Sequence, residues 1–319
     1  MKKVAIGVDI GGTFTKYGIV DQDGNCLIDG TISTTEKKDI DGFLSNLKTT
    51  IDTATAKISE PIDIKGIGLG APNGNFYNGT IEYAPNLAWK GIVPFIDLFK
   101  KYYDLPMFLT NDANAAAIGE MVYGGAKKMK NFVIITLGTG LGSGLVVNGE
   151  LVYGHDGFAG ELGHVTIVRD GRMCATGRRG SLETYASASG IKRTIFELLA
   201  DSLHDSEFRD VTFNQLTAKM ISDAAKKNDK IALEAFELTG KYLGEALADT
   251  VAHISPEAIF LFGGLANAGE LIMEPTKRHM ELNLLKIFQN KIKILPSGLT
   301  ETNAAVMGAS ALVWKELNN

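Results

Sequence analysis

The sequence has few cysteines and no long apolar run, and each shortage excludes a class of protein. Cys26 and Cys174 are the only cysteines among 319 residues. Two cysteines are too few for a disulfide scaffold, so we expect a reducing compartment and a cytoplasmic protein. No stretch approaches the roughly 18 apolar residues of a membrane span. Two lysines precede the apolar residues 4–8, but that stretch is too short for a secretory signal. We therefore expect no membrane partner.

Basic charge is also scarce. The chain has 32 Lys and Arg residues against 37 Asp and Glu residues, a net charge of −5. Without a basic cluster, this balance argues against nucleic acid as the main partner. No Gly/Ser-rich or Pro-rich tract divides the chain. At about 100–200 residues per domain, the length predicts two globular domains.

Glycine, in contrast, is abundant: the chain has 36 glycines, well above an average usage of about 7%. They gather in short loops that follow predicted strands. The opening pattern predicts strands at 4–8, 16–20 and 26–28, a glycine turn at 9–15, a helix at 42–56 and a strand at 64–69. An antiparallel meander is therefore expected at the start of the chain.

A similar pattern recurs further on, with a strand predicted at 131–136, a glycine turn at 137–144 and a strand at 145–147. Gly11 aligns with Gly138, and Ile19 with Val146, at one constant offset. We interpret this as a weak internal repeat, although any two meanders can share such a pattern. Later segments predict a helix at 231–254, strands at 258–262 and near 292–295, and a helix at 303–315. The alternation of strands and helices predicts an α/β fold.

The glycine turns suit an anion. Gly11 and Gly12 let backbone N–H groups approach a phosphate, Thr13 and Thr15 add hydroxyls, and Asp9 before them suits a hydrated Mg²⁺. The alternative for this first turn is a tight hairpin. The second turn has four glycines and two hydroxyl residues at 138–144, more than a hairpin needs, and it matches neither a Walker A loop nor the dinucleotide fingerprint. With Gly263 and Gly264 after a third strand, the turns predict a nucleotide in a cleft.

These segments resemble the ROK family of sugar kinases and repressors, in the superfamily that includes hexokinase, actin and the heat-shock ATPases. Residues 9–13 resemble its first phosphate motif, 137–144 its second and 262–264 its adenosine motif. Residues 111–117 resemble its catalytic segment, and 160–164 its sugar-binding segment. The resemblance extends from Asp9 to about Gly308 in the family's order.

The resemblance implies two RNase H-like (actin-like ATPase) domains that close on sugar and ATP across an interdomain cleft. The smaller domain would comprise residues 1–112 plus about 298–319, with the C-terminal helix crossing back to it. The larger domain would comprise residues 113–297. ATP and Mg²⁺ are the implied cofactors, and a homodimer is the implied assembly.

The resemblance also implies roles for particular residues. Asp112 would be the general base that accepts the proton of the attacking sugar hydroxyl; its alternative role is a helix N-cap before Ala113. For His164, the alternative is a structural histidine. The implied sugar ligands are Asn111, Asp112, Glu161, His164 and Glu183, with Asn73 and Asn86 approaching from the smaller domain. The implied nucleotide site comprises Asp9 (holding Mg²⁺ through water), Gly11, Gly12, Thr13, Thr15, Lys16, Gly138, Thr139, Gly140, Gly263 and Gly264.

One segment departs from the family. Many members hold a structural zinc with one histidine and three cysteines in a C-x-C-G-x-x-G-C-x-E pattern. Here Cys174 and Glu183 remain, but Thr176 and Ser181 replace two thiolates. One cysteine and one histidine cannot close a tetrahedral site. We therefore predict no zinc, and a loop held by hydrogen bonds of the Thr176 and Ser181 hydroxyls.

The predicted function is an ATP-dependent hexose kinase that makes a 6-phosphate, with glucose as the favoured substrate. Kinases for N-acetylmannosamine, N-acetylglucosamine, fructose or allose are the enzymatic alternatives. A sugar-responsive repressor is the alternative from another class, but it needs a helix-turn-helix of tens of residues, and only eight residues precede Asp9. A catalytically silent sugar sensor is a third alternative, against which Asp9, Asp112 and both glycine turns argue.

Overall fold

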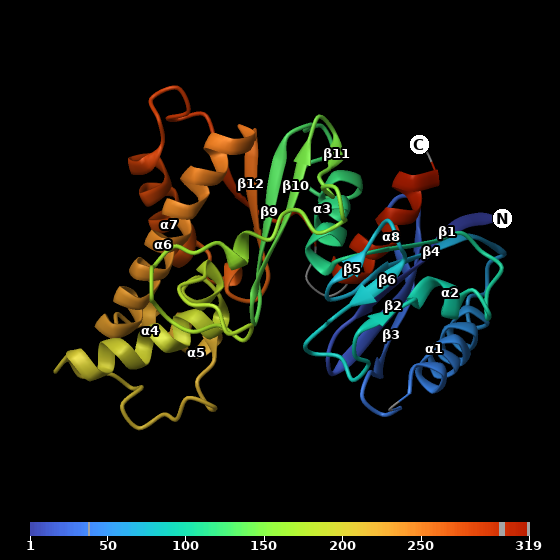
Figure 1. Cartoon of the computed structure of the whole chain (residues 1–319), viewed down its shortest axis with the longest axis horizontal. Helices are drawn as coiled ribbons and strands as arrows, with labels where there is room; N and C mark the ends of the chain where they lie inside the picture. The colour runs from blue at the N-terminus through green and yellow to red at the C-terminus, as the bar shows by residue number, and fades with distance from the viewer. Residues whose placement is uncertain (38, 300–303, 318–319) are drawn as a thin grey trace.

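A computed structural model describes residues 1–37, 39–299 and 304–317, arranged as two α/β halves that lie side by side along the longest axis (Figure 1). The sheet of the first half has the strand order β3-β2-β1-β4-β8. Its strands are β1 (Lys2–Ile10), β2 (Phe14–Asp21), β3 (Cys26–Ser33), β4 (Ile62–Gly70) and β8 (Met107–Thr110). The sheet of the second half has the order β11-β10-β9-β12-β13. Its strands are β9 (Phe132–Leu137), β10 (Leu141–Val147), β11 (Glu150–Leu151), β12 (Ala258–Phe262) and β13 (Lys293–Pro296).

The two sheets follow one plan, which confirms the internal repeat. In each, the first strand pairs antiparallel with the second and parallel with the fourth: β1 with β2 and β4, and β9 with β10 and β12. The turn 11–13 joins β1 to β2, and the turn 138–140 joins β9 to β10 at the predicted offset. The predicted second turn was too long, because Gly142 and Gly144 pair with Thr136 and Ile134 inside the sheet.

Helices cover the sheets. The first half has α1 (Ile40–Thr55) and α2 (Phe95–Phe99), with a small sheet of β5 (Gly74–Asn75), β6 (Thr80–Glu82) and β7 (Ile92–Val93). The second half has α4 (Ala188–Asp201), α5 (Ala218–Lys226), α6 (Lys230–Ile254) and α7 (Glu270–Asn283), with short 3₁₀ helices at Leu162–His164, Leu182–Thr184 and Ala266–Ala268. Each half has its own apolar core. Within the described residues, no helix is both long and apolar enough to cross a membrane.

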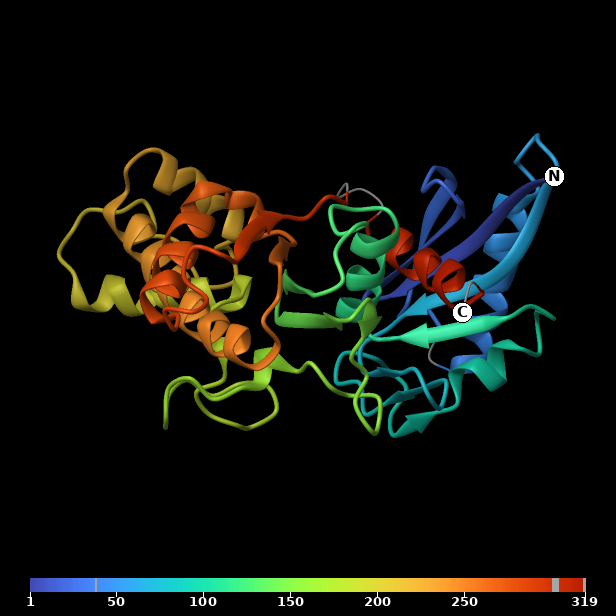
Figure 2. The same cartoon turned by 90° about the horizontal axis from the view of Figure 1, so that it is seen from above.

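Two helices join the halves. α3 (Asp112–Val122) lies between the two sheets, beside α8 (Ala304–Leu317) (Figure 2). Small residues make this possible: a Cβ on Gly144 would lie 2.7 Å from the Ala117 Cβ, and one on Gly308 would lie 2.6 Å from the Ala115 carbonyl oxygen. α8 also packs on β1 and β4 of the first sheet. Asn303, where we predicted this helix to begin, lies outside the described residues.

Candidate active site

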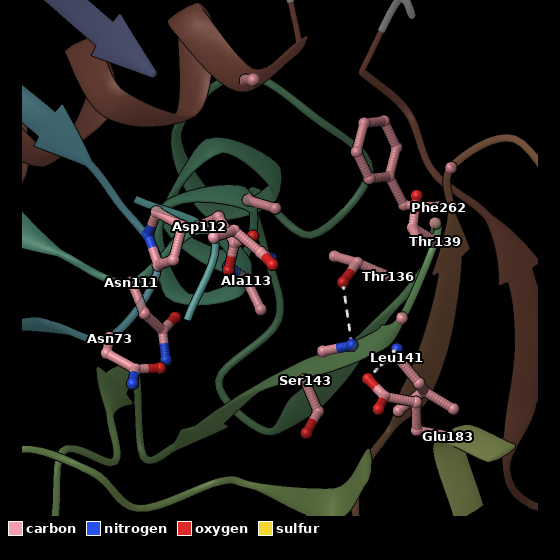
Figure 3. Close-up of a pocket in the computed structure, with 18 of the residues that line it drawn as sticks. Asn73, Asn111, Asp112, Ala113, Thr136, Thr139, Leu141, Ser143, Glu183 and Phe262 are labelled. Carbon is pink, nitrogen blue, oxygen red and sulfur yellow. Dashed lines mark hydrogen bonds between the residues drawn. The ribbon is translucent and has the colours of Figure 1, made fainter. Parts of the chain in front are cut away.

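A cleft of about 470 Å³ opens between the halves, and both contribute to its walls. It brings together most of the predicted site. Figure 3 shows Asn73, Asn111 and Asp112 on one side, and Thr139, Leu141, Glu183 and Phe262 on the other. The predicted residues that line the cleft are Asp9, Asn73, Asn86, Asn111, Asp112, Gly138, Thr139, Gly140, Glu161, Glu183 and Gly263.

The other predicted residues do not line the cleft in this conformation. Thr15 is fully buried, and its Oγ1 lies 2.8 Å from Thr34 Oγ1 in a hydrogen bond. Side chains along a strand point alternately to its two faces, and in β2 the Thr15 side chain points into the protein interior. The interpretation of Thr15 as a hydrogen-bond donor to phosphate is therefore wrong for this conformation. The remaining residues outside the lining are Gly11, Gly12, Thr13, Lys16, His164 and Gly264. Gly12 lies against Asn86, which lines the cleft: a Cβ at Gly12 would come 2.7 Å from the Asn86 carbonyl oxygen.

Asp112 occupies the first helical position of α3 and is not its N-cap. Asn111 is the cap, because its Oδ1 accepts a hydrogen bond from the Asn114 N–H at 2.7 Å. The capping interpretation of Asp112 is therefore wrong. One Asp112 carboxylate oxygen accepts from the Ala113 N–H at 2.9 Å. The side chain is accessible from the cleft, yet the surrounding walls desolvate it and raise its pKa above the usual range.

Asp9, near the end of β1, lies close to Asp112. Burial and then the charge of Asp112 raise the pKa of Asp9 to about 6, while Lys16 acts in the opposite direction. Gly70 ends β4 between the two acids: a Cβ there would lie 3.7 Å from Asp9 Oδ1 and 3.9 Å from Asp112 Cα. A cation beside this pair would relieve the cost of ionising both carboxyl groups.

These donors fit a magnesium ion held largely by water and phosphate oxygens. Mg²⁺ prefers oxygen ligands and keeps several waters when one or two carboxylates bind it. Within the described ranges, no three His, Cys, Asp or Glu side chains form a metal-binding group.

Glu161 and Glu183 line the same cleft as Asp112, and Figure 3 shows Glu183 on the side opposite Asp112. Burial raises the pKa of Glu161, the charges of Asp112 and Glu183 raise it further, and His164 partly offsets the rise. The His164 Nε2 lies 3.8 Å from the Glu161 Oε2. The His164 Nδ1 is buried without a partner in the described part of the chain. A carboxylate accepts hydrogen bonds and a neutral imidazole can both donate and accept, so these groups suit a ligand with several hydroxyls.

Two residues that the sequence interpretation missed shape this wall. The buried Ser143 donates its hydroxyl to the Gly160 carbonyl and accepts from the Leu162 N–H at 3.2 Å. It thereby fixes the chain on both sides of Glu161. Thr136 accepts from the Gly142 N–H at 3.2 Å. Ser143 lies inside the second glycine motif, and its hydroxyl was the feature of the sequence that could have indicated this structural role.

The loop that departs from the zinc pattern is held by hydrogen bonds. The Cys174 Sγ lies 2.9 Å from the Thr176 Oγ1, and this bond contributes most to lowering the thiol pKa. The buried Ser181 hydroxyl lies near enough to Cys174 to help lower the thiol pKa, but it makes no hydrogen bond of normal geometry within the described residues. Arg172 supplies the stronger anchor: its guanidinium donates to the Thr184 carbonyl at 2.8 Å and to Glu197.

The sequence model of the ROK family matches residues 5–316. The chain belongs to the ROK family. It is 34% identical to a glucokinase of Halalkalibacterium halodurans, over 98% of this chain and 96% of that protein. It is also 28% identical to a xylose repressor of Caldicellulosiruptor bescii, over 98% of this chain but 78% of the repressor.

A solved ROK structure confirms the predicted fold class. The ROK family glucokinase of Streptomyces griseus, in complex with glucose and AMPPNP, superposes with a TM-score of 0.80 at 31% identity. The match covers 98% of this chain and 99% of that one. The predicted ROK fold of two RNase H-like units is therefore the fold of this chain.

Proposed function

We propose that this protein is a glucokinase, which transfers the γ-phosphoryl group of ATP to the 6-hydroxyl of glucose with Asp112 as general base. The observation that carries the proposal is the position of Asp112: an accessible carboxylate on the cleft wall, opposite the second glycine turn and Glu183. Family membership and the glucokinase relatives support the coarser assignment, an ATP-dependent sugar kinase.

Positioning and charge neutralisation account for most of the chemistry in phosphoryl transfer. The Asp112 oxygen accepts the 6-hydroxyl proton as the oxygen attacks the γ-phosphorus, and the Ala113 N–H keeps the carboxylate oriented. Asn111, Glu161 and Glu183, which line the cleft, bind the other sugar hydroxyls. His164 joins them when the cleft closes, and Asn73 and Asn86 approach from the first half. Closure of the cleft excludes water, which limits hydrolysis of ATP.

The second glycine turn and Gly263 are proposed to bind ATP, which supplies the phosphoryl group. Gly11, Gly12, Thr13 and Lys16 join this site only when the first turn moves toward it. Asp9 would hold Mg²⁺, which neutralises phosphate charge, through water. Residues 1–112 with 298–319, and residues 113–297, are proposed as the two closing domains. A cytoplasmic homodimer remains part of this proposal, as do the absence of zinc and of nucleic-acid or membrane partners.

A coupled assay of ADP release against a panel of hexoses and N-acetylhexosamines tests the proposal. We expect glucose to give the highest kcat/KM, with mannose, fructose, allose, N-acetylglucosamine and N-acetylmannosamine in the same panel. A higher kcat/KM for an N-acetylhexosamine, fructose or allose would replace glucose with that sugar. Nuclear magnetic resonance spectroscopy of the product identifies the phosphorylated position.

A sugar-sensing protein without catalysis is the second candidate, because xylose repressors are also relatives. The same assay separates the two functions. If calorimetry shows that a sugar binds while no ADP is released above the background rate, the kinase proposal fails and the sensor is favoured.

A further inference from the structure

Glu183 contacts the second glycine turn directly. Its Oε2 accepts a hydrogen bond from the N–H of Leu141, the residue after the turn, at 3.2 Å (Figure 3). A Cβ at Gly140 would collide with this same oxygen. The carboxylate therefore packs against the turn without spare room, and a displacement of one displaces the other.

The start of the second glycine turn is held by a residue that follows Glu183 closely in the chain. The Gly138 carbonyl accepts from the Ala188 N–H at 2.9 Å, at the start of α4. The Gly138 N–H is used within the turn, donating to the Gly140 carbonyl at 3.1 Å. For the N–H groups of Thr139 and Gly140, the structure records no acceptor among its described residues. These two donors remain available to an anion.

Glu183 also faces the wall proposed to bind sugar. Both Glu183 and Glu161 line the same cleft, and the charge of Glu183 contributes to raising the pKa of Glu161. The structure records a protein partner only for the Oε2 of Glu183 within the described residues. The Oε1 can accept a sugar hydroxyl while the Oε2 keeps its bond to Leu141.

We propose that Glu183 couples the two substrates: a sugar hydroxyl on one carboxylate oxygen fixes the other oxygen on the Leu141 N–H and orders the glycine turn for the nucleotide phosphates. This inference rests on the proposed function. A turn that sugar has already ordered loses less conformational entropy when ATP binds. Each substrate therefore raises the affinity for the other by the same factor.

Glu161 provides the matched control. It lies on the same wall, but its segment is fixed by Ser143 rather than by a bond to the turn. Glu161→Gln is expected to weaken glucose binding without changing the factor by which the nucleotide strengthens it. Glu183→Asp is one methylene shorter, so its carboxylate cannot contact the turn and the sugar together. Glu183→Gln keeps the length and one oxygen for the Leu141 N–H.

The experiment is calorimetric titration of glucose with and without saturating AMPPNP and Mg²⁺. We expect AMPPNP to tighten glucose binding at least about 5-fold in the wild type and in Glu161→Gln. In Glu183→Asp the factor should fall to about 1, whereas Glu183→Gln should keep most of it. Amide hydrogen exchange of a peptide covering residues 137–144 should slow with glucose alone in the wild type and not in Glu183→Asp.

Equal coupling factors in the wild type and Glu183→Asp would overturn the proposal, as would a wild-type factor of 1. If Glu183→Asp does not fold, loss of coupling in Glu183→Gln would overturn it, because that variant retains the bond to the turn. These readouts use binding alone. A protein that couples the two ligands without releasing ADP would contradict the proposed function and leave this inference standing.

Discussion

Asp9 and Asp112 lie on either side of the end of β4, and both carboxyl groups have raised pKa values. Desolvation is the main cause of each raised pKa, so ionising these two acids lowers the free energy of unfolding of the ligand-free protein. Such a cost is common at catalytic sites, where function and stability conflict. Replacing one of these acids should therefore change stability as well as activity.

Asp9→Asn is expected to stabilise the ligand-free protein while it impairs catalysis. The pKa of Asp9 is about 6 in the folded protein and near 3.8 unfolded, so folding takes up a proton between these values. The Asp9 contribution to the free energy of unfolding therefore falls as pH rises through this window and is lowest above it. Urea unfolding should show Asp9→Asn more stable than the wild type by about 1–3 kcal/mol at pH 7.5, and by less at pH 5.

The exposed Asp201→Asn on α4 serves as the control for Asp9→Asn and should change stability little at either pH. An Asp9→Asn variant that is no more stable than the wild type at pH 7.5 would show that burial of Asp9 carries no such cost.

At the scale of elements, Arg172 anchors the loop that precedes the 3₁₀ helix Leu182–Thr184, which contains Glu183. The Arg172 side chain is 7% exposed. Its guanidinium donates to the Thr184 carbonyl at 2.8 Å and the Thr194 hydroxyl at 2.9 Å. It also pairs with Glu197 and lies 4.3 Å from the centre of the Tyr185 ring. One planar cation thus connects the loop, the 3₁₀ helix and α4.

Arg172→Lys is expected to lower the free energy of unfolding by about 2–4 kcal/mol, because an ammonium cannot reproduce this planar set of donors. Glu197→Gln should cost less, since the Glu197 side chain is 59% exposed and the carbonyl acceptors of Arg172 remain. Urea unfolding of the two variants measures the difference. A larger loss in Glu197→Gln than in Arg172→Lys would contradict the assignment of Arg172 as the anchor.

Patterning within single elements was enough to predict most strands and helices, including the repeated meander. The apolar residues of β1 and β9 are continuous and buried, so their signal does not depend on distant contacts. Predictions that depended on which other group a side chain contacts were less reliable. Thr15 faces Thr34 rather than the cleft, and Asn111 rather than Asp112 caps α3. The Arg172 anchor joins segments whose approach no local pattern indicates.

At the scale of the whole molecule, Glu120 fixes the place where the chain returns to the first half after β13. It is fully buried on α3. Its carboxylate accepts from the Gly125 N–H and the Gly298 N–H, each at 2.7 Å, and from the Ser297 hydroxyl. This arrangement anchors one crossing between the halves, so closure would take place around a defined point.

Glucose is expected to close the cleft, because the residues proposed to bind it lie in both halves. Small-angle scattering should show a smaller radius of gyration for the wild type at saturating glucose than without sugar. Glu161→Gln at a glucose concentration that leaves it mostly unbound is the control and should not change. An unchanged wild-type radius of gyration would contradict closure.

In the proposed reaction, Asp112 removes the proton of the attacking sugar hydroxyl. Asp112→Asn keeps an oxygen for the Ala113 N–H but cannot accept that proton. The decisive measurement is the kcat of glucose-dependent ADP release by Asp112→Asn, with the glucose dissociation constant measured in parallel. We predict a kcat about 10²–10⁴-fold below wild type with glucose binding within a few-fold. A kcat within a few-fold of wild type would contradict the claim.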